Sequence, residues 1–167
     1  SFISTINMAD LKKYVKISAK IIRAIPLPPI SIRKGPVPIF PPDVKVKKFF
    51  DELGTTIEIK NEKLSLNFWS TSSMMAPFYE LLQTLSDWLV KKGINKSDSQ
   101  KYITSLFIAL SEDAKENSKK DLKILVKNSQ TPKGLNEQAV KELRKLGFYK
   151  SLNKTTNKVL KRLKKNK

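Results

Sequence analysis

The sequence lacks cysteine and histidine altogether. Without cysteine, the 167-residue chain has no disulfide bond, thiolate nucleophile or iron–sulfur cluster. Without histidine, it has no imidazole base or ligand, which excludes a Ser-His-Asp triad and the usual zinc sites within this chain. Its longest apolar run, from Leu106 to Leu110, is far shorter than the roughly 18 residues of a membrane-spanning helix. The first nine residues also lack the features of a signal peptide. We therefore expect a reduced, cytoplasmic protein with no membrane partner.

Glycine is scarce as well. The five glycines lie at positions 35, 54, 93, 134 and 147, so no G-x-G sequence exists anywhere in the chain. A dinucleotide-binding fold needs a glycine-rich turn between its first strand and first helix. The sequence therefore predicts that these residues alone do not form a complete cofactor-binding domain.

The chain is rich in positive charge, with 33 lysines and arginines against 15 acidic residues and a net charge of +18. Such a balance is typical of nucleic-acid or acidic-membrane binders, or of a surface that is simply lysine-rich. Only four of the basic residues are arginines, and no basic stretch is interleaved with aromatic residues. The one dense cluster, from Lys158 to Lys167, complements the dipole at the carboxyl end of a helix. These features favour the lysine-rich surface, and we do not expect a nucleic-acid partner.

The first 60 residues predict a small mixed part. Seven of the nine prolines lie between Pro26 and Pro42, where they interrupt short extended segments. The polar side chains of Asn7 or Asp10 and of Asp43 are suited to cap short helices. We expect strands at 2–6, 20–25, 37–40 and 55–59, and helices through Val15 and over 44–53.

From Phe78 onward the apolar residues recur at helical spacing. Five amphipathic helices are predicted, with Gly93 ending the first and Gly147 ending the fourth. The fold class is therefore mostly α with a small α/β N-terminal part. We place the boundary between a first domain, 1–60, and an all-α domain, 61–167.

Three segments of the chain, Ile21–Pro29, Thr71–Pro77 and Thr131–Asn136, carry motifs that in this order and spacing resemble those of pyrroline-5-carboxylate reductases. The strand Ile21-Ile22-Arg23-Ala24-Ile25-Pro26-Leu27-Pro28-Pro29 is similar to the family's Arg-Val-Met-Pro-Asn-Thr-Pro. Thr131-Pro132-Lys133-Gly134-Leu135-Asn136 stands where the family has Ser-Pro-Gly-Gly-Thr-Thr. Thr71-Ser72-Ser73-Met74-Met75-Ala76-Pro77 stands where the family has Ser-Gly-Ser-Gly-Pro-Ala-Tyr. By order and spacing, the resemblance covers nearly the whole chain.

The resemblance implies a remnant of a Rossmann sheet followed by a helical dimerisation domain. It implies an NADP- or NAD-dependent reductase that works as a homodimer and reduces a small imino or keto acid, with the cofactor held mainly by an N-terminal part outside this chain. The implied substrate-binding residues are Thr131, Lys133, Gly134, Asn136, Ser72 and Ser73, and the implied cofactor-binding residues are Pro26 and Leu27.

The sequence departs from the family at these motifs. Leu27 and Pro28 replace Asn and Thr, and the polar or small residues of the other two motifs are replaced in part by Lys133 and by Met74 and Met75. A substrate other than pyrroline-5-carboxylate therefore stays open. From the residues alone, Thr131 or Asn136 serves equally as the cap of the next helix, and Ser72 and Ser73 as caps of the long helix.

Two functional hypotheses follow. The first is that the chain is the C-terminal fragment of a reductase that reduces a cyclic imino acid to proline or a related product, and that the fragment alone is inactive. The second is that it is a non-enzymatic helical dimerisation module.

Overall fold

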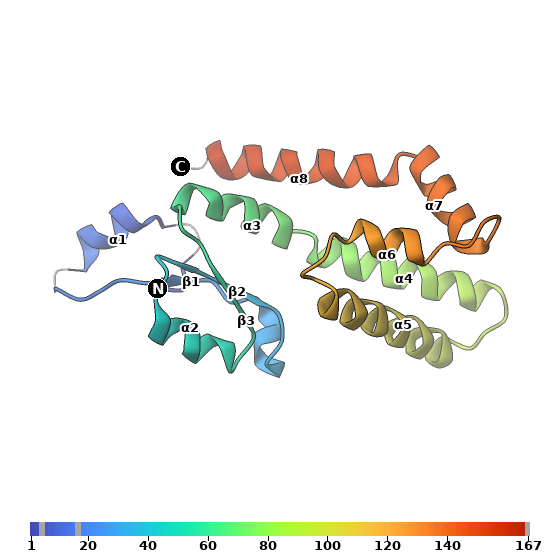
Figure 1. The fold of residues 1–167 in the computed structure, drawn as a ribbon, viewed down its shortest axis with the longest axis horizontal. Helices are drawn as coiled ribbons and strands as arrows, with labels where there is room; N and C mark the ends of the chain where they lie inside the picture. The colour runs from blue at the N-terminus through green and yellow to red at the C-terminus, as the bar shows by residue number, and fades with distance from the viewer. Residues whose placement is uncertain (4–5, 16–17, 166–167) are drawn as a thin grey trace. The chain divides into compact units, whose positions relative to one another are not determined.

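The computed structural model describes residues 1–3, 6–15 and 18–165, and Figure 1 shows their helices and strands. The chain divides into two compact units. The first contains Ser1–Thr71 together with Leu163–Lys167, and the second contains Ser72–Arg162.

The first unit is built around a three-stranded sheet in the order β1-β2-β3. β1 pairs antiparallel with β2, and β2 pairs parallel with β3, so the helix between β2 and β3 makes a crossover. The elements of this unit are α1 (Met8–Tyr14), β1 (Arg23–Ala24), η1 (Pro28–Ile32), β2 (Pro36–Phe40), α2 (Val44–Asp51), β3 (Thr55–Glu58) and η2 (Glu62–Leu64).

Local sequence explains where these helices begin. The side chain of Asn7 accepts a hydrogen bond from the Asp10 N–H and caps α1, and that of Asp43 accepts one from the Val46 N–H and caps α2. The small core lies where α2 covers the sheet. Its buried residues are Ala24, Val37, Ile39 and Phe50.

The backbone of Ser1 adds to the edge of this sheet at β1. The terminal amino group of Ser1 donates to the Ile22 carbonyl at 2.7 Å, and the Ala24 N–H donates to the Ser1 carbonyl at 2.8 Å. The expected strand at 2–6 is therefore reduced to this one pairing in the described residues, because Phe2 and Ile3 are not in a strand. Positions 4 and 5 lie outside the described residues.

The second unit is all-helical, and α3 leads into it. α3 (Ser65–Ser72) belongs to the first unit up to Thr71, and the helices that follow it are α4 (Met75–Lys91), α5 (Lys96–Glu116), α6 (Lys123–Asn128), α7 (Leu135–Lys145) and α8 (Phe148–Lys165). α4 and α5 lie side by side and form the main helix pair of this unit (Figure 1). None of the helices in the described part of the chain is long and apolar enough to cross a membrane.

The helical unit has almost no core of its own. Among its described residues, Ile103 is the one buried apolar side chain, accompanied by the small buried residues Ser86 and Ser99. Large apolar residues stand exposed instead, including Trp88 at 57% and Tyr102 at 63% of their surface. Because burial of apolar surface is the main force that holds helices together, this unit has many more apolar faces than it covers by itself.

Candidate functional site

The connection between α6 and α7 contains a tight turn at residues 131–134. The N–H of Gly134 donates to the carbonyl of Thr131 at 2.8 Å, Pro132 occupies the second position, and Lys133 occupies the third with φ +62°. A proline followed by a residue with positive φ is typical of a type II turn, in which glycine usually takes the third position. Lys133 therefore takes the position that glycine usually occupies in such a turn.

Glycine is required at position 134 because the turn brings this residue close to Thr131. A Cβ at this position would lie 2.2 Å from Thr131 Oγ1 and 2.9 Å from the Thr131 carbonyl oxygen. The backbone of residue 134 consequently contacts Thr131 directly. Of the predicted site residues, the structure brings Thr131 and Gly134 together within this turn.

The turn leads straight into α7. Gly134 is the N-cap residue and has no side chain to cap the helix, so the first N–H groups of α7 lack a side-chain cap from this position. Free N–H groups at a helix N-terminus are suited to bind an anion. Asn136 does not cap this end of α7, because its Nδ2 donates to the Ser129 carbonyl at 2.9 Å and ties the helix to the incoming chain.

One residue that the sequence reading missed stabilises this turn. The Glu137 carboxylate accepts a hydrogen bond from the Lys133 N–H at 2.7 Å and pairs with Lys141 Nζ at 2.8 Å. The hydrogen bond from Lys141 and the one from the Lys133 backbone hold the pKa of the Glu137 carboxyl below its ordinary value. A glutamate three residues after the N-cap is the signal that indicates this arrangement in a sequence.

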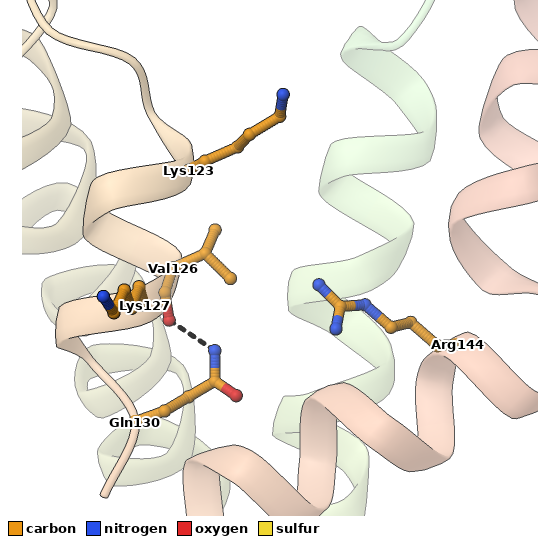
Figure 2. A pocket seen from close by; sticks show the side chains of 5 residues that line it. All are labelled: Lys123, Val126, Lys127, Gln130 and Arg144. Atoms are coloured by element: carbon orange, nitrogen blue, oxygen red, sulfur yellow. Dashed lines mark hydrogen bonds between the residues drawn. The ribbon is translucent and has the colours of Figure 1, made fainter.

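A hollow of about 390 Å³ lies between α6 and α7. Figure 2 shows Gln130 and Arg144 pointing into it from opposite sides, while the Lys127 ammonium group points away. The Gln130 side-chain amide donates to the Val126 carbonyl. The hollow is lined by Lys123, Val126, Lys127, Gln130 and Arg144, so its charged residues are all cationic.

The remaining predicted residues lie on other connections of the chain. Ser72 is the last residue of α3, and Ser73 is the residue after it. Both are half-buried and lie at the junction between α3 and α4. Neither is the N-cap of α4, which is Met74. Pro26 and Leu27 lie between β1 and η1 in the first unit, separated from β1 by Ile25, and the Leu27 carbonyl accepts the Ile30 N–H at the start of η1.

Comparisons with known proteins agree with this architecture. The fold is similar to that of three solved structures. A pyrroline-5-carboxylate reductase from Coxiella burnetii has a TM-score of 0.82 and 19% identity, with 96% of this chain and 62% of that chain covered. The Plasmodium falciparum pyrroline carboxylate reductase with NADP bound has a TM-score of 0.78 and 21% identity, with 97% and 64% covered. The Streptococcus pyogenes 1-pyrroline-5-carboxylate reductase has a TM-score of 0.80 and 21% identity, with 96% and 64% covered.

These likenesses show the fold: a remnant of a Rossmann sheet followed by helices, as expected from the sequence. The chain spans a little under two thirds of the length of each of these structures. The search of curated proteins found no match. The model of the pyrroline-5-carboxylate reductase dimerisation domain matches residues 64–166, which is more than half of the sequence. The chain therefore belongs to the pyrroline-5-carboxylate reductase family.

Proposed function

We propose that this chain supplies the dimerising helical part of an NAD(P)H-dependent reductase that acts on a small imino or keto acid. The observation that carries the proposal is the match of residues 64–166 to the family's dimerisation domain. The thin core of the helical unit supports it, because a second copy would cover the apolar faces that one copy leaves exposed.

One such face lies on α5. Tyr102, Leu106 and Leu110 follow one another at four-residue spacing and expose 63%, 39% and 54% of their surface. Residues at this spacing lie on one side of a helix. An apolar stripe of this kind is suited to pack against a helix of a second copy.

The substrate side of the proposal rests on the turn at 131–134 and the N-terminus of α7. Uncapped N–H groups there are the kind of donor that holds a substrate carboxylate, and the cations that line the hollow between α6 and α7 favour an acidic ligand. Ser72 and Ser73 are proposed to complete the substrate pocket, and Pro26 and Leu27 to contact the nicotinamide side of NADP or NAD. The cofactor would supply the hydride, while the residues of this chain bind and orient the acid.

We further infer that the 167 residues alone do not transfer hydride, because they contain no glycine-rich dinucleotide turn. An assay of NADPH or NADH oxidation with pyrroline-5-carboxylate tests this. Turnover by the isolated chain would contradict the inference.

Dimerisation is tested by measuring the molar mass of the purified chain with light scattering. We expect twice the 19.0 kDa of one copy. Leu106→Glu should shift the protein to the monomer, because it places a charge within the apolar stripe of α5. Thr104→Glu is the matched control, since it adds the same charge to an exposed position two residues from both Tyr102 and Leu106, on the opposite side of the same helix. A wild-type chain that stays monomeric would contradict the proposal.

A further inference from the structure

The positive charge is distributed unevenly along the chain, with an excess in its last 25 residues. Glu142 is the last acidic residue, and ten of the 33 basic residues follow it. Residues 1–142 therefore hold 23 basic and all 15 acidic residues, a net charge of +8, while the final 25 residues carry +10. A lysine-rich composition alone does not explain a segment that is free of acids.

The structure places this charge on one helix. α8 extends from Phe148 to Lys165 and is about 27 Å long at the usual rise per residue. At about 100° per residue, its cations fall within an arc of about 160°, and its apolar residues fall within a separate arc of about 120°. The cations on this cationic face are Lys150, Lys154, Lys158, Lys161, Arg162, Lys164 and Lys165.

This cationic face is open to solvent and is not neutralised. All seven of its residues are exposed, and the ion pairs found in the described ranges do not involve α8. Val159, Leu160 and Leu163, on the apolar side, are half-buried. The fold thus partly covers the apolar side and leaves the cationic face free for a partner.

The helix dipole does not account for this arrangement. Cations in the last turn of a helix are favourable, but Lys150 lies in the first turn of α8 and Lys154 in the second. Lysines four residues apart on one helix face also repel one another. A row of unpaired cations along the whole helix is therefore unfavourable unless an anionic partner neutralises it.

We propose that the cationic face of α8 binds the phosphate backbone of nucleic acid without sequence specificity. An extended and nearly uniform positive surface suits a regular polyanion. The face holds a single arginine and no aromatic residue, so it lacks the side chains that usually read bases. An interfacial membrane helix would need its whole apolar side free for insertion, whereas here Val159, Leu160 and Leu163 of that side are half-buried. The proposal is independent of the reductase activity.

The test measures fluorescence anisotropy of a labelled DNA duplex of random sequence with the full chain. With about four phosphate contacts, affinity should fall about 100-fold between about 50 and 200 mM salt. The variant Lys150→Gln, Lys154→Gln, Lys158→Gln should bind at least about tenfold more weakly and show a shallower salt dependence.

A matched control separates the cationic face from the total charge. Lys34→Gln, Lys60→Gln, Lys63→Gln removes three exposed lysines of the first unit and lowers the net charge from +18 to +15, as the α8 variant does. This control should bind like the wild type. Equal weakening of both variants, or no binding by the wild type at low salt, would overturn the proposal.

Vesicles of phosphatidylcholine and phosphatidylserine provide the competing anionic surface. Retention of the chain by these vesicles but not by the duplex would also overturn the proposal. Circular dichroism and molar-mass measurements on each variant establish that it folds and keeps the oligomeric state of the wild type. A failure of dimerisation is therefore distinguished from a failure of nucleic-acid binding.

Discussion

The guanidinium group of Arg23 pairs with the carboxylate of Glu62, which lies 39 residues later in the chain. The Arg23 side chain is only 2% exposed, while that of Glu62 is 23% exposed. The same carboxylate oxygen accepts the Met8 N–H at 2.7 Å. One carboxylate therefore joins β1, η2 and the start of α1, three parts of the first unit that are distant in sequence.

Removing the charge of Glu62 and removing that of Arg23 should lower the free energy of unfolding by different amounts. Glu62→Gln should lower the free energy of unfolding by about 3 kcal/mol, because it leaves a buried guanidinium without its carboxylate. Arg23→Met should cost less, because the remaining carboxylate is partly solvated and keeps the Met8 N–H. Urea unfolding at one protein concentration measures both. Equal losses, or a greater loss for Arg23→Met, would show that burial does not govern the pair.

Lys133 is expected to strain the turn before α7. Its φ of +62° is unfavourable for a residue with a Cβ by about 1–2 kcal/mol, and glycine's greater freedom in the unfolded chain offsets part of this. Lys133→Gly should therefore raise the free energy of unfolding by about 0.5–1 kcal/mol. Lys145→Gly, at the end of α7, is the control and should lower it. A destabilised Lys133→Gly variant would argue against strain at this residue.

Gly134→Ala should have the opposite effect. Its new Cβ would meet the Thr131 carbonyl oxygen at 2.9 Å as well as the Thr131 hydroxyl, so the turn would have to open. We expect a loss of about 1–3 kcal/mol in the free energy of unfolding. Gly93→Ala serves for comparison, because its Cβ meets nothing within 4 Å and its cost comes from a φ of +95° alone. Double replacement with Thr131→Ala should recover only the part of the loss that comes from the hydroxyl.

The contacts of Glu137 predict a dependence of stability on pH. Its pKa is lowered in the folded protein, first by the hydrogen bond with Lys141 and then by the Lys133 N–H. The folded state therefore prefers the ionised carboxylate. This contribution is present in full above the ordinary pKa near 4.5 and is lost as the pH falls through the lowered value.

Unfolding experiments from neutral to acidic pH test this contribution. The difference in stability between wild type and Glu137→Gln should be constant near neutral pH and should shrink below about pH 4.5. Glu142→Gln removes an exposed acid of the same helix that makes no ion pair among the described residues. It is the matched control. A difference that grows on acidification would contradict the contacts assigned to Glu137.

Signals that act within a few residues could be predicted from the sequence. Asp43 caps α2 as expected, and of the two candidates Asn7 and Asp10 it is Asn7 that caps α1. Gly93 and Gly147 follow the helices they were expected to end. The cap of α5 is Asn95, whose side chain accepts the Asp98 N–H, although Ser97 and Asp98 are also residue types that cap helices. Where several residues suited to cap a helix follow one another, the backbone geometry decides which of them is the N-cap.

Features that depend on distant residues could not be predicted. The sequence does not predict α3, because this segment is rich in serine and its apolar residues have no clear periodicity. Packing against other parts of the fold decides that Ser65, Leu66 and Ser70 are the buried residues of this helix. At the candidate site, the sequence indicates Thr131, Lys133 and Gly134 as binding residues but does not indicate the contacts of Glu137. Its carboxylate reaches back four residues, and only the three-dimensional turn shows which N–H group it meets.

Ile103 is the single buried apolar side chain among the described residues of the helical unit, and this has a consequence for the protein in a cell. If the exposed apolar faces of this unit are buried only when two copies associate, association stabilises the folded state. The folded fraction then rises with the concentration of the chain. Low expression would then expose the protein to proteases, even though no residue had changed. The concentration of the protein in the cell would therefore determine how much of the helical unit escapes proteolysis.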